Sequence, residues 1–184
     1  LCGRLRELFA RGLQRATRYF EFGAGGSTVL AVQKGLTVQG VESDPAWVDA
    51  LKDKLGEACQ IEVVDIGPTG DWGLPTSDAA SARFPAYSQA ILAHDTAFDL
   101  ILVDGRFRVA CTMTAIQHLL DKHPQPRKAR IFIHDFWNRP HYHAVLQFLD
   151  VVQRVDTAGV FRVKASLDRA QIEATWKTYA QKSG

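Results

Sequence analysis

A glycine-rich turn near the N-terminus carries the residues most able to do chemistry. Residues 19–28 read YFEFGAGGST, so an apolar run that contains Glu21 leads directly into three closely spaced glycines. The glycines are Gly23, Gly25 and Gly26. Glycine lets a backbone approach a ligand where a Cβ atom would collide, and a helix beginning near Ser27 would direct free N–H groups into the same space. The turn therefore predicts a binding site for a small ligand at a strand end.

A second acid lies at the end of the next apolar stretch. Residues 36–41 are mostly apolar and lead into Glu42 and Ser43. An ionised carboxylate accepts two hydrogen bonds, and the vicinal hydroxyls of a ribose offer two donors. In sheets that bind nucleotides, an acid at this position bonds the ribose. The two signals together predict a nucleoside pocket in which Glu42 binds the ribose and Ser43 lies beside it.

The details of the turn indicate which nucleoside it takes. A dinucleotide fingerprint has a third glycine for close helix–strand packing, but this chain has Thr28 there. A pyrophosphate also gains nothing from the carboxylate of Glu21. S-adenosylmethionine (SAM) carries an ammonium and a sulfonium but no phosphate, so acids attract it. We therefore expect SAM, with Glu21 near its amino group; the alternative is that Glu21 caps backbone N–H groups of the turn.

Two further acids follow later apolar stretches. Asp65 comes after residues 61–64 and is expected to accept a hydrogen bond from the adenine amino group, while Ile66 presents its backbone N–H and packs on the ring. The alternative for Asp65 is an Asx turn that begins the loop. Asp104 follows the apolar run 98–103. It would lie at the centre of the carboxyl edge of the sheet, where open α/β sheets bind ligands.

The last expected parallel strand ends in the sequence HDFWN, residues 134–138. His134 is the natural proton acceptor near neutral pH, and Asp135 is the next candidate. With Asp104, these two residues form the predicted catalytic group.

The motif E-x-G-x-G-G-S-T, followed by V-E-S-D, resembles the cofactor motifs of class I SAM-dependent methyltransferases. The resemblance extends from about Arg18 to about Lys164. It implies that Asp104 faces the amino group of the cofactor or the acceptor. It also implies that the turn lines the methionine and ribose portions of SAM. The turn residues concerned are Gly23, Gly25, Gly26 and Ser27.

The resemblance also raises the question of a metal. In metal-dependent relatives, such as the catechol and macrolide O-methyltransferases, acids equivalent to Asp104 and Asp135 hold Mg²⁺. A hard cation prefers oxygen ligands and would help to ionise an acceptor hydroxyl. This chain departs from the catechol type because Phe136 stands where that type has Asn, and Asn138 would then have to supply the third ligand. The alternative is a solvated or hydrogen-bonded pair of acids.

For several other side chains near these motifs, the sequence leaves two alternative roles. Arg106 and Arg108 would clamp a carboxylate or phosphate of the acceptor, or pair with Asp104 or Asp135. Four aromatic residues would form a lid over the acceptor or serve in ordinary packing. These aromatic residues are Trp72, Phe84, Tyr87 and Trp137.

The elements that must position these residues follow from the patterning. Apolar stretches alternate with helical patterns, which predicts an α/β fold with a Rossmann-like, doubly wound sheet and helices on both faces. The resemblance implies five parallel strands plus a C-terminal antiparallel hairpin strand. The expected parallel strands are 18–22, 36–42, 61–64, 98–103 and 129–134, and the hairpin segments are 151–155 and 160–163. Residues 1–184 are expected to form a single SAM-binding domain.

Expected helices lie between these strands. The opening helix has Leu5, Leu8, Phe9 and Leu13 at helical spacing. Asp44-Pro45 predicts a helix start, with Asp44 as N-cap. The apolar stripe of that helix is Trp47, Val48, Leu51 and Leu55. Further helices are expected at 86–94, 109–122, 140–149 and 168–180.

The composition limits the partners. The net charge of +2 argues neither for nor against an anionic partner, and no apolar run approaches the roughly 20 residues that span a bilayer. Three cysteines without a C-x-x-C motif suit reduced thiols in the cytoplasm. No basic stripe with interleaved aromatic residues indicates nucleic-acid binding. We expect a small-molecule acceptor, no nucleic acid and no membrane, while the oligomeric state stays open.

Three functions fit these observations. The first is a SAM-dependent methyltransferase acting on an oxygen of a small molecule. The second is a SAM-binding module without catalysis, because the chain has little sequence for a separate acceptor domain. The third is a nicotinamide-dependent oxidoreductase, against which Thr28 and Glu21 argue.

Overall fold

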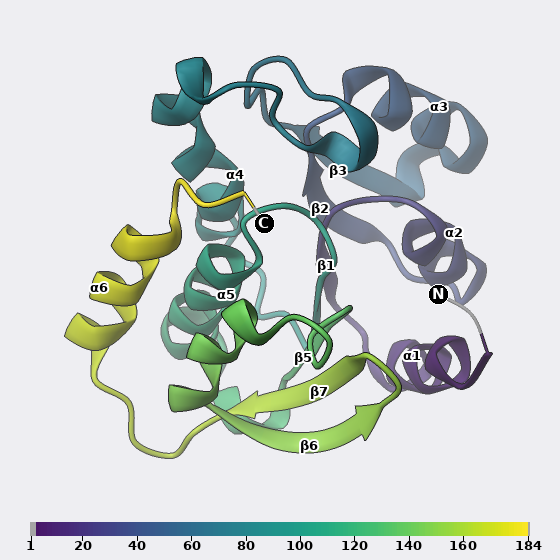
Figure 1. The fold of residues 1–184 in the computed structure, drawn as a ribbon. Helices are drawn as coiled ribbons and strands as arrows, with labels where there is room; N and C mark the ends of the chain where they lie inside the picture. The colour runs from purple at the N-terminus through teal and green to yellow at the C-terminus, as the bar shows by residue number, and fades with distance from the viewer. Residues whose placement is uncertain (1–2, 184) are drawn as a thin grey trace.

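The computed structural model describes residues 3–183, apart from the side chain of Trp72. Its centre is a seven-stranded sheet with helices on both faces (Figure 1). The strands are β1 (Tyr19–Phe22), β2 (Val38–Glu42), β3 (Cys59–Val63), β4 (Leu100–Val103), β5 (Arg130–Ile133), β6 (Leu149–Val155) and β7 (Ala158–Val163). The α-helices are α1 (Gly3–Arg15), α2 (Gly26–Gln33), α3 (Pro45–Leu55), α4 (Phe84–Gln89), α5 (Arg108–Lys122) and α6 (Arg169–Tyr179). The 3-10 segments are η1 (Gly56–Ala58), η2 (Asp71–Gly73), η3 (Asp78–Arg83), η4 (Ala90–Ala93), η5 (Pro126–Lys128) and η6 (Pro140–Gln147).

The strands lie in the order β3-β2-β1-β4-β5-β7-β6. β1 to β5 pair in parallel, in agreement with the sequence, whereas β7 pairs antiparallel with both β5 and β6. The prediction of one antiparallel hairpin strand is corrected, because both strands of the hairpin extend the sheet. β7 is almost entirely buried and β6 mostly exposed. A buried strand such as β7 needs partners on both sides for its backbone groups.

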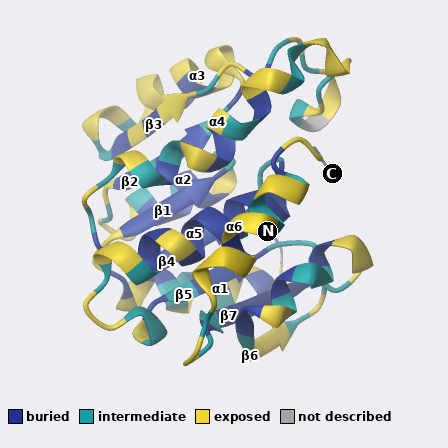
Figure 2. Cartoon of the chain, turned by 90° about the vertical axis from the view of Figure 1, so that its left-hand side faces the viewer, coloured by how far each residue is buried: buried dark blue, intermediate teal, exposed yellow. Residues whose placement is uncertain are grey.

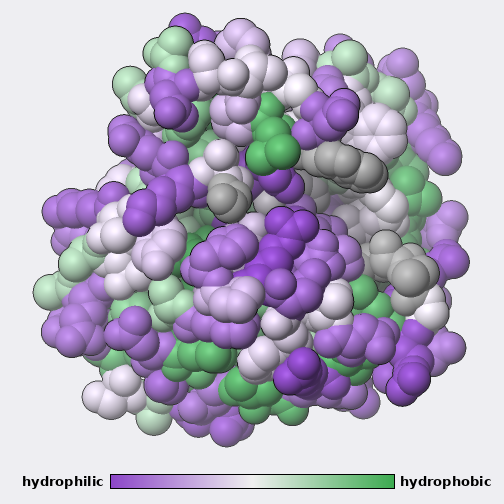
Figure 3. Space-filling view, in the orientation of Figure 1, coloured by the Kyte–Doolittle hydropathy of each residue, from purple (hydrophilic) through white to green (hydrophobic). Residues whose placement is uncertain are grey.

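The helices form two layers. α1, α2 and α3 lie on one face of the sheet, and α4 and α5 lie on the other, with α6 packed against α5 (Figure 1). Each layer buries its apolar side chains against the sheet, so a hydrophobic core forms on either face. Buried residues concentrate in the central strands and in α5 (Figure 2). On the face shown in Figure 3, hydrophilic side chains predominate and hydrophobic ones form small groups.

Local sequence explains several helix boundaries. Asp44 caps α3 by accepting a hydrogen bond from the backbone N of Trp47 at 3.1 Å, with Pro45 in the first turn as expected. The helix expected at 86–94 is instead α4 continued by η4, and the one expected after Pro140 is the 3-10 segment η6. Apolar spacing over two or three turns does not separate a period of 3.6 from one of 3.0.

The strand register brings the predicted motifs to one edge. Phe22 pairs with Val41 on one side and with Val103 on the other, and Val103 pairs with Ile133. The next residue of each of these four strands therefore emerges at the same edge of the sheet. These residues are Gly23, Glu42, Asp104 and His134.

The described cysteines are free thiols, and the described helices are too short or too polar to span a membrane. Cys59 and Cys111 are buried and free, while Cys2 lies outside the described residues. Within residues 3–183, no helix is both long enough and apolar enough to cross a bilayer.

Candidate functional site

A cavity of about 910 Å³ opens at the carboxyl ends of the parallel strands. It lies where β1 separates the half of the sheet that holds β2 and β3 from the half that begins with β4. Open α/β sheets bind ligands at this switch point. The volume is at the upper end of the range for small-molecule sites, so a nucleoside and a second small molecule fit together.

The glycine-rich turn forms one wall of the cavity, which Gly23, Gly25 and Gly26 all line. Gly23 has a φ of 86°, and a Cβ there would come to 2.7 Å from the backbone of Gly105. A Cβ on Gly26 would meet no atom within 4 Å, and one on Gly25 would only touch Trp47 at 3.9 Å. The first glycine is thus required by the fold, whereas the other two leave open space beside the N-terminus of α2. That open space suits close approach of a ligand.

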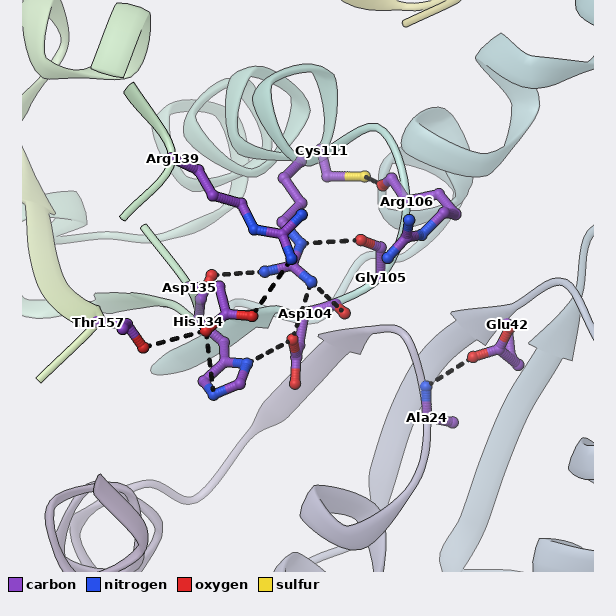
Figure 4. A network of polar contacts seen from close by, with 11 residues as sticks. Ala24, Glu42, Asp104, Gly105, Arg106, Cys111, His134, Asp135, Arg139 and Thr157 are labelled. Atoms are coloured by element: carbon purple, nitrogen blue, oxygen red, sulfur yellow. Dashed lines mark hydrogen bonds and ion pairs between the residues drawn. The ribbon is translucent and has the colours of Figure 1, made fainter. Parts of the chain in front are cut away.

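Glu42 lines the cavity and is held by the turn and by its own neighbour. Its Oε2 accepts from the backbone N of Ala24 at 3.0 Å (Figure 4). Its Oε1 accepts from the backbone N of Ser43 at 2.6 Å and from the Ser43 hydroxyl at 3.1 Å. A carboxylate has about four acceptor sites, so one stays free, and rotation of the Ser43 hydroxyl frees another. Glu42 can therefore accept from two ligand hydroxyls in a fixed position.

Glu21 lies behind the turn and is absent from the cavity lining. It is fully buried, and its carboxylate accepts hydrogen bonds from the hydroxyls of Tyr19 (2.7 Å) and Thr28. Burial raises the pKa of Glu21 from 4.5 to about 7, while hydrogen bonds from Thr28, Ser27 and Tyr19 oppose that rise. Thr28 also accepts from the backbone N of Gly25 at 2.8 Å. Glu21 therefore holds the turn through hydroxyl groups, and it does not line the cavity in which the sequence predicts it beside the amino group of the cofactor.

Ser27 is buried and lines the cavity, as its place at the start of α2 predicts. Asp65 and Ile66 do not line it. Asp65 forms an Asx turn with the backbone N of Gly67 at 2.8 Å and an exposed ion pair with Arg83, which is the alternative that the sequence left open. Ile66 is buried within the core on the α5 side of the sheet.

Asp104 and His134 meet at the other end of the cavity. The Nδ1 of His134 lies 2.9 Å from Oδ1 of Asp104 (Figure 4), and both residues line the cavity. A carboxylate only accepts, so Nδ1 is the donor to Asp104, and in the neutral ring Nε2 is the nitrogen that has a free lone pair. This pairing orients the ring and leaves one nitrogen able to accept a proton.

Asp135 stands on the opposite side of the His134 ring. Its Oδ1 lies 3.9 Å from Nε2 of His134 and accepts from the Thr157 hydroxyl at 3.0 Å, while Oδ2 lies 3.5 Å from Arg139. Burial would raise the pKa of Asp135, but His134, the Thr157 hydrogen bond and the arginines outweigh it and lower that pKa. Asp135 also has a positive φ of 48°, a conformation that costs energy in most residues. Its position is therefore set by partners on several elements.

Arg108 connects the two strand ends from behind. Its guanidinium is 5% exposed and donates to the carbonyls of Gly105 (3.0 Å), Asp104 (3.2 Å) and His134 (2.5 Å). It also pairs with Oδ1 of Asp104 at 3.2 Å. Of the two roles open for Arg108, the structure therefore shows the pairing with Asp104.

The expected metal ligands do not assemble. Among the described residues, no group of three or more His, Cys, Asp or Glu side chains is placed to hold a metal ion. Asn138 is exposed and outside the cavity lining. Asp104 and Asp135 already pair with Arg108 and Arg139. The donor set that this chain offers does not fit Mg²⁺.

Several lining residues were missed or differently placed by the sequence. Trp47 was expected in the apolar stripe of α3, but it is 48% exposed, lines the cavity and donates from Nε1 to the carbonyl of Ala24 at 2.9 Å. Arg139 also lines the cavity, without any sequence motif to indicate it. Of the expected lid aromatics, Tyr87 lines the cavity and Phe84 and Trp137 do not; the Trp72 side chain lies outside the described parts. The loop after β3 contributes Thr69, Gly70, Gly73 and Leu74.

A scan against protein-family models finds no match. A search of curated protein sequences finds no relative. Solved structures do match. A methyltransferase-like protein from Silicibacter pomeroyi DSS-3 is 29% identical, with 100% of this chain and 96% of that chain covered and a TM-score of 0.78.

Two more distant structures share the fold. A methyltransferase from Podospora anserina, solved with bound SAH, is 16% identical, covers 89% of this chain and 80% of its own, and has a TM-score of 0.56. The N-methyltransferase NodS from Bradyrhizobium japonicum WM9 is 15% identical, covers 86% of this chain and 95% of its own, and has a TM-score of 0.50.

Proposed function

We propose, from the confirmed resemblance of the chain to class I SAM-dependent methyltransferases, that it transfers a methyl group from SAM to an oxygen of a small molecule. The single observation that supports SAM binding most is Glu42, whose carboxylate is held by the turn with acceptor sites facing the cavity. Residues 1–184 act in this proposal as one SAM-binding domain.

The cofactor half of the cavity suits a cationic adenosine compound. Glu42 binds the ribose hydroxyls, and the open space at Gly25 and Gly26 takes the body of the ligand. Glu42 and Asp44 line this half, so a cation is attracted there more than a diphosphate. Asp65 and Ile66 lie outside the lining, and the adenine contacts first expected of them fall to the loop with Gly70 and Gly73.

The catalytic half suits removal of a proton from a hydroxyl. Bound SAM supplies an electrophilic methyl group, so the protein has mainly to align the acceptor and to exclude water. Asp104 fixes the Nδ1–H tautomer of His134, and Nε2 then accepts the hydroxyl proton. Asp135, ionised and 3.9 Å from Nε2, stabilises the imidazolium that results. No step in this proposal uses a metal, because the carboxylates are already paired.

A small acceptor is supported by the dimensions of the site. The cavity of about 910 Å³ leaves room beside a nucleoside for one further small molecule. The exclusion of nucleic acids remains a prediction from the charge pattern. In this proposal the acceptor side is bordered by Tyr87 and Arg139, which line the cavity and lie outside the cofactor motifs.

Two measurements test the proposal. Isothermal titration calorimetry should show SAH binding to the purified chain with a dissociation constant near the micromolar range. Incubation with methyl-labelled SAM and a fractionated metabolite extract should then transfer label to a small product. Binding without any labelled product would instead favour a SAM-binding module without catalysis. Binding of NADH but not SAH would contradict the proposal altogether.

A further inference from the structure

Arg106 is the one cavity arginine that the described residues leave without a counter-ion. It lines the cavity and follows Gly105, which packs against Gly23 of the cofactor turn. Its Nε is buried and has no hydrogen-bond partner. In residues 3–183, no carboxylate lies within ion-pair distance of its guanidinium; the contact that Figure 4 draws to Arg106 runs from the Cys111 thiol to its backbone carbonyl.

The two other arginines of the cavity are used differently. Arg108 is held by the carbonyls of Gly105 and His134 and by Asp104. Arg139 pairs with Asp135 at 3.5 Å. Arg108 and Arg139 each pair with a carboxylate. Among the described residues of this part of the site, Arg106 is therefore the arginine whose positive charge has no carboxylate partner.

An unpaired and partly buried guanidinium is unfavourable. A buried donor without a partner costs about 1–3 kcal/mol, and more when the group is charged. Burial lowers the pKa of Arg106, and the nearby charge of Arg108 lowers it further. The charge becomes favourable once an anion enters the cavity, since the two terminal nitrogens of a guanidinium offer a pair of donors to a carboxylate or phosphate.

We propose that Arg106 forms a subsite for an oxyanion, a carboxylate or a phosphate, carried by the methyl acceptor. The inference rests on the proposed function, because it assigns a chemical class to the second substrate of that site. Arg106 follows Gly105, whose backbone packs against Gly23 of the cofactor turn and comes directly after Asp104. This position allows such a group to anchor the acceptor while its hydroxyl faces His134. The α-carboxylate of SAM has the same chemistry, and the experiment must separate the two sources.

Three probes separate them in the full chain. SAH contains the α-carboxylate, 5′-methylthioadenosine lacks it, and inorganic phosphate stands for the acceptor group. Each is titrated into wild type, Arg106→Gln and Arg106→Lys, with phosphate added both to the free protein and to the SAH-saturated protein. Arg83→Gln is the matched control, because Arg83 is exposed and pairs with Asp65 outside the cavity. Thermal unfolding of each variant shows that it is folded.

The proposal expects phosphate to bind the SAH-saturated wild type at least tenfold more tightly than Arg106→Gln, with SAH affinity unchanged. The phosphate affinity of Arg106→Lys should lie between those of wild type and Arg106→Gln, because lysine keeps the positive charge but lacks the planar set of donors of a guanidinium. A tenfold loss of SAH affinity in Arg106→Gln, with 5′-methylthioadenosine unaffected, would overturn the acceptor assignment in favour of the cofactor carboxylate. Equal phosphate and SAH affinities in all variants would overturn the subsite. Failure of wild type to bind SAH would instead contradict the proposed function, while phosphate binding to the free protein would still report on Arg106.

Discussion

Gly23 and Gly105 lie backbone against backbone, so closely that a Cβ on Gly23 would come to 2.7 Å from both the N and Cα atoms of Gly105. The contact joins the turn after β1 to the turn after β4, where the strands are neighbours in the sheet. A Cβ on Gly105 would in turn come to 2.9 Å from the N atom of Gly23. This pair therefore fixes the cofactor turn relative to Asp104.

Substitutions at two glycines of the same turn should differ sharply in their effect on stability. Gly23→Ala should lower the free energy of unfolding by about 2 kcal/mol or more, because the residue has a positive φ and a backbone clash. Gly26→Ala should leave stability unchanged or slightly raised, since its Cβ meets nothing and alanine favours the helix. Urea unfolding measures both changes.

Ligand binding should separate the two glycines further. Gly26→Ala should remain folded yet bind SAH at least tenfold more weakly, because its methyl group occupies space in the cavity. If Gly26→Ala bound SAH as wild type does, the open space beside α2 would not be where the ligand lies.

His134 should be found mainly as the Nδ1–H tautomer. Asp104 accepts from this nitrogen at 2.9 Å, and a carboxylate cannot donate in return. Long-range ¹H–¹⁵N correlation spectra of the free protein report the tautomer directly, without knowledge of the acceptor. Asp104→Ala should lose the preference. A predominant Nε2–H form in the wild type would rule out the base assigned here.

The free energy of unfolding should fall as the pH rises from about 4.5 to about 7, and the titration of Glu21 should cause this fall. Its pKa is raised in the folded state, so the folded protein binds a proton more tightly than the unfolded chain. The contribution of Glu21 to the free energy of unfolding is fully present below its pKa in the unfolded chain. This contribution is lost as the pH rises through its pKa in the folded protein. By linkage the loss is on the order of 3 kcal/mol.

Glu21→Gln should remove this dependence, because glutamine does not titrate. The quantity to follow is the difference in free energy of unfolding between wild type and variant at pH 5 and at pH 8, which cancels the other titrating groups. A difference that stays constant between these pH values would show that Glu21 is not the titrating group.

Trp47→Phe should weaken SAH binding by several-fold while the fold persists. The variant loses the hydrogen bond from Nε1 to the carbonyl of Ala24, worth about 1 kcal/mol, and reduces the surface beside Gly25. Trp176→Phe is the matched control, because Trp176 donates to Ser88 away from the cavity. Equal losses in the two variants would point to general destabilisation.

The sequence predicts the frame of the site well because strand ends are local signals. Apolar runs that end in an acid or histidine place Glu42, Asp104 and His134 correctly on the edge, since parallel strands share one carboxyl edge. Asp44 is predicted as a cap by its own spacing to Pro45. These features depend on residues within a few positions of one another.

The remainder depends on contacts that spacing does not encode. The side chain of Glu21 lies on the face of the sheet that α2 covers, so its carboxylate binds the hydroxyls of Tyr19 and Thr28 behind the turn. Asp65 follows β3, the strand at one edge of the sheet, where its exposed carboxylate pairs with Arg83. Trp47 has helical spacing suited to the core, yet its indole reaches the turn. Which of the two arginines near Asp104 is buried likewise follows only from packing.

The ribose contact of Glu42 is the central claim, and calorimetric titration of SAH into Glu42→Gln tests it most directly. A charged hydrogen bond contributes about 1.5–3 kcal/mol, so the dissociation constant should rise by roughly 10- to 100-fold over that of wild type. Glu57→Gln, an exposed residue of η1, should bind as wild type does. Since glutamine can accept from only one of Ala24 and Ser43, thermal unfolding must accompany the titration. A folded Glu42→Gln variant with wild-type affinity for SAH would contradict the account.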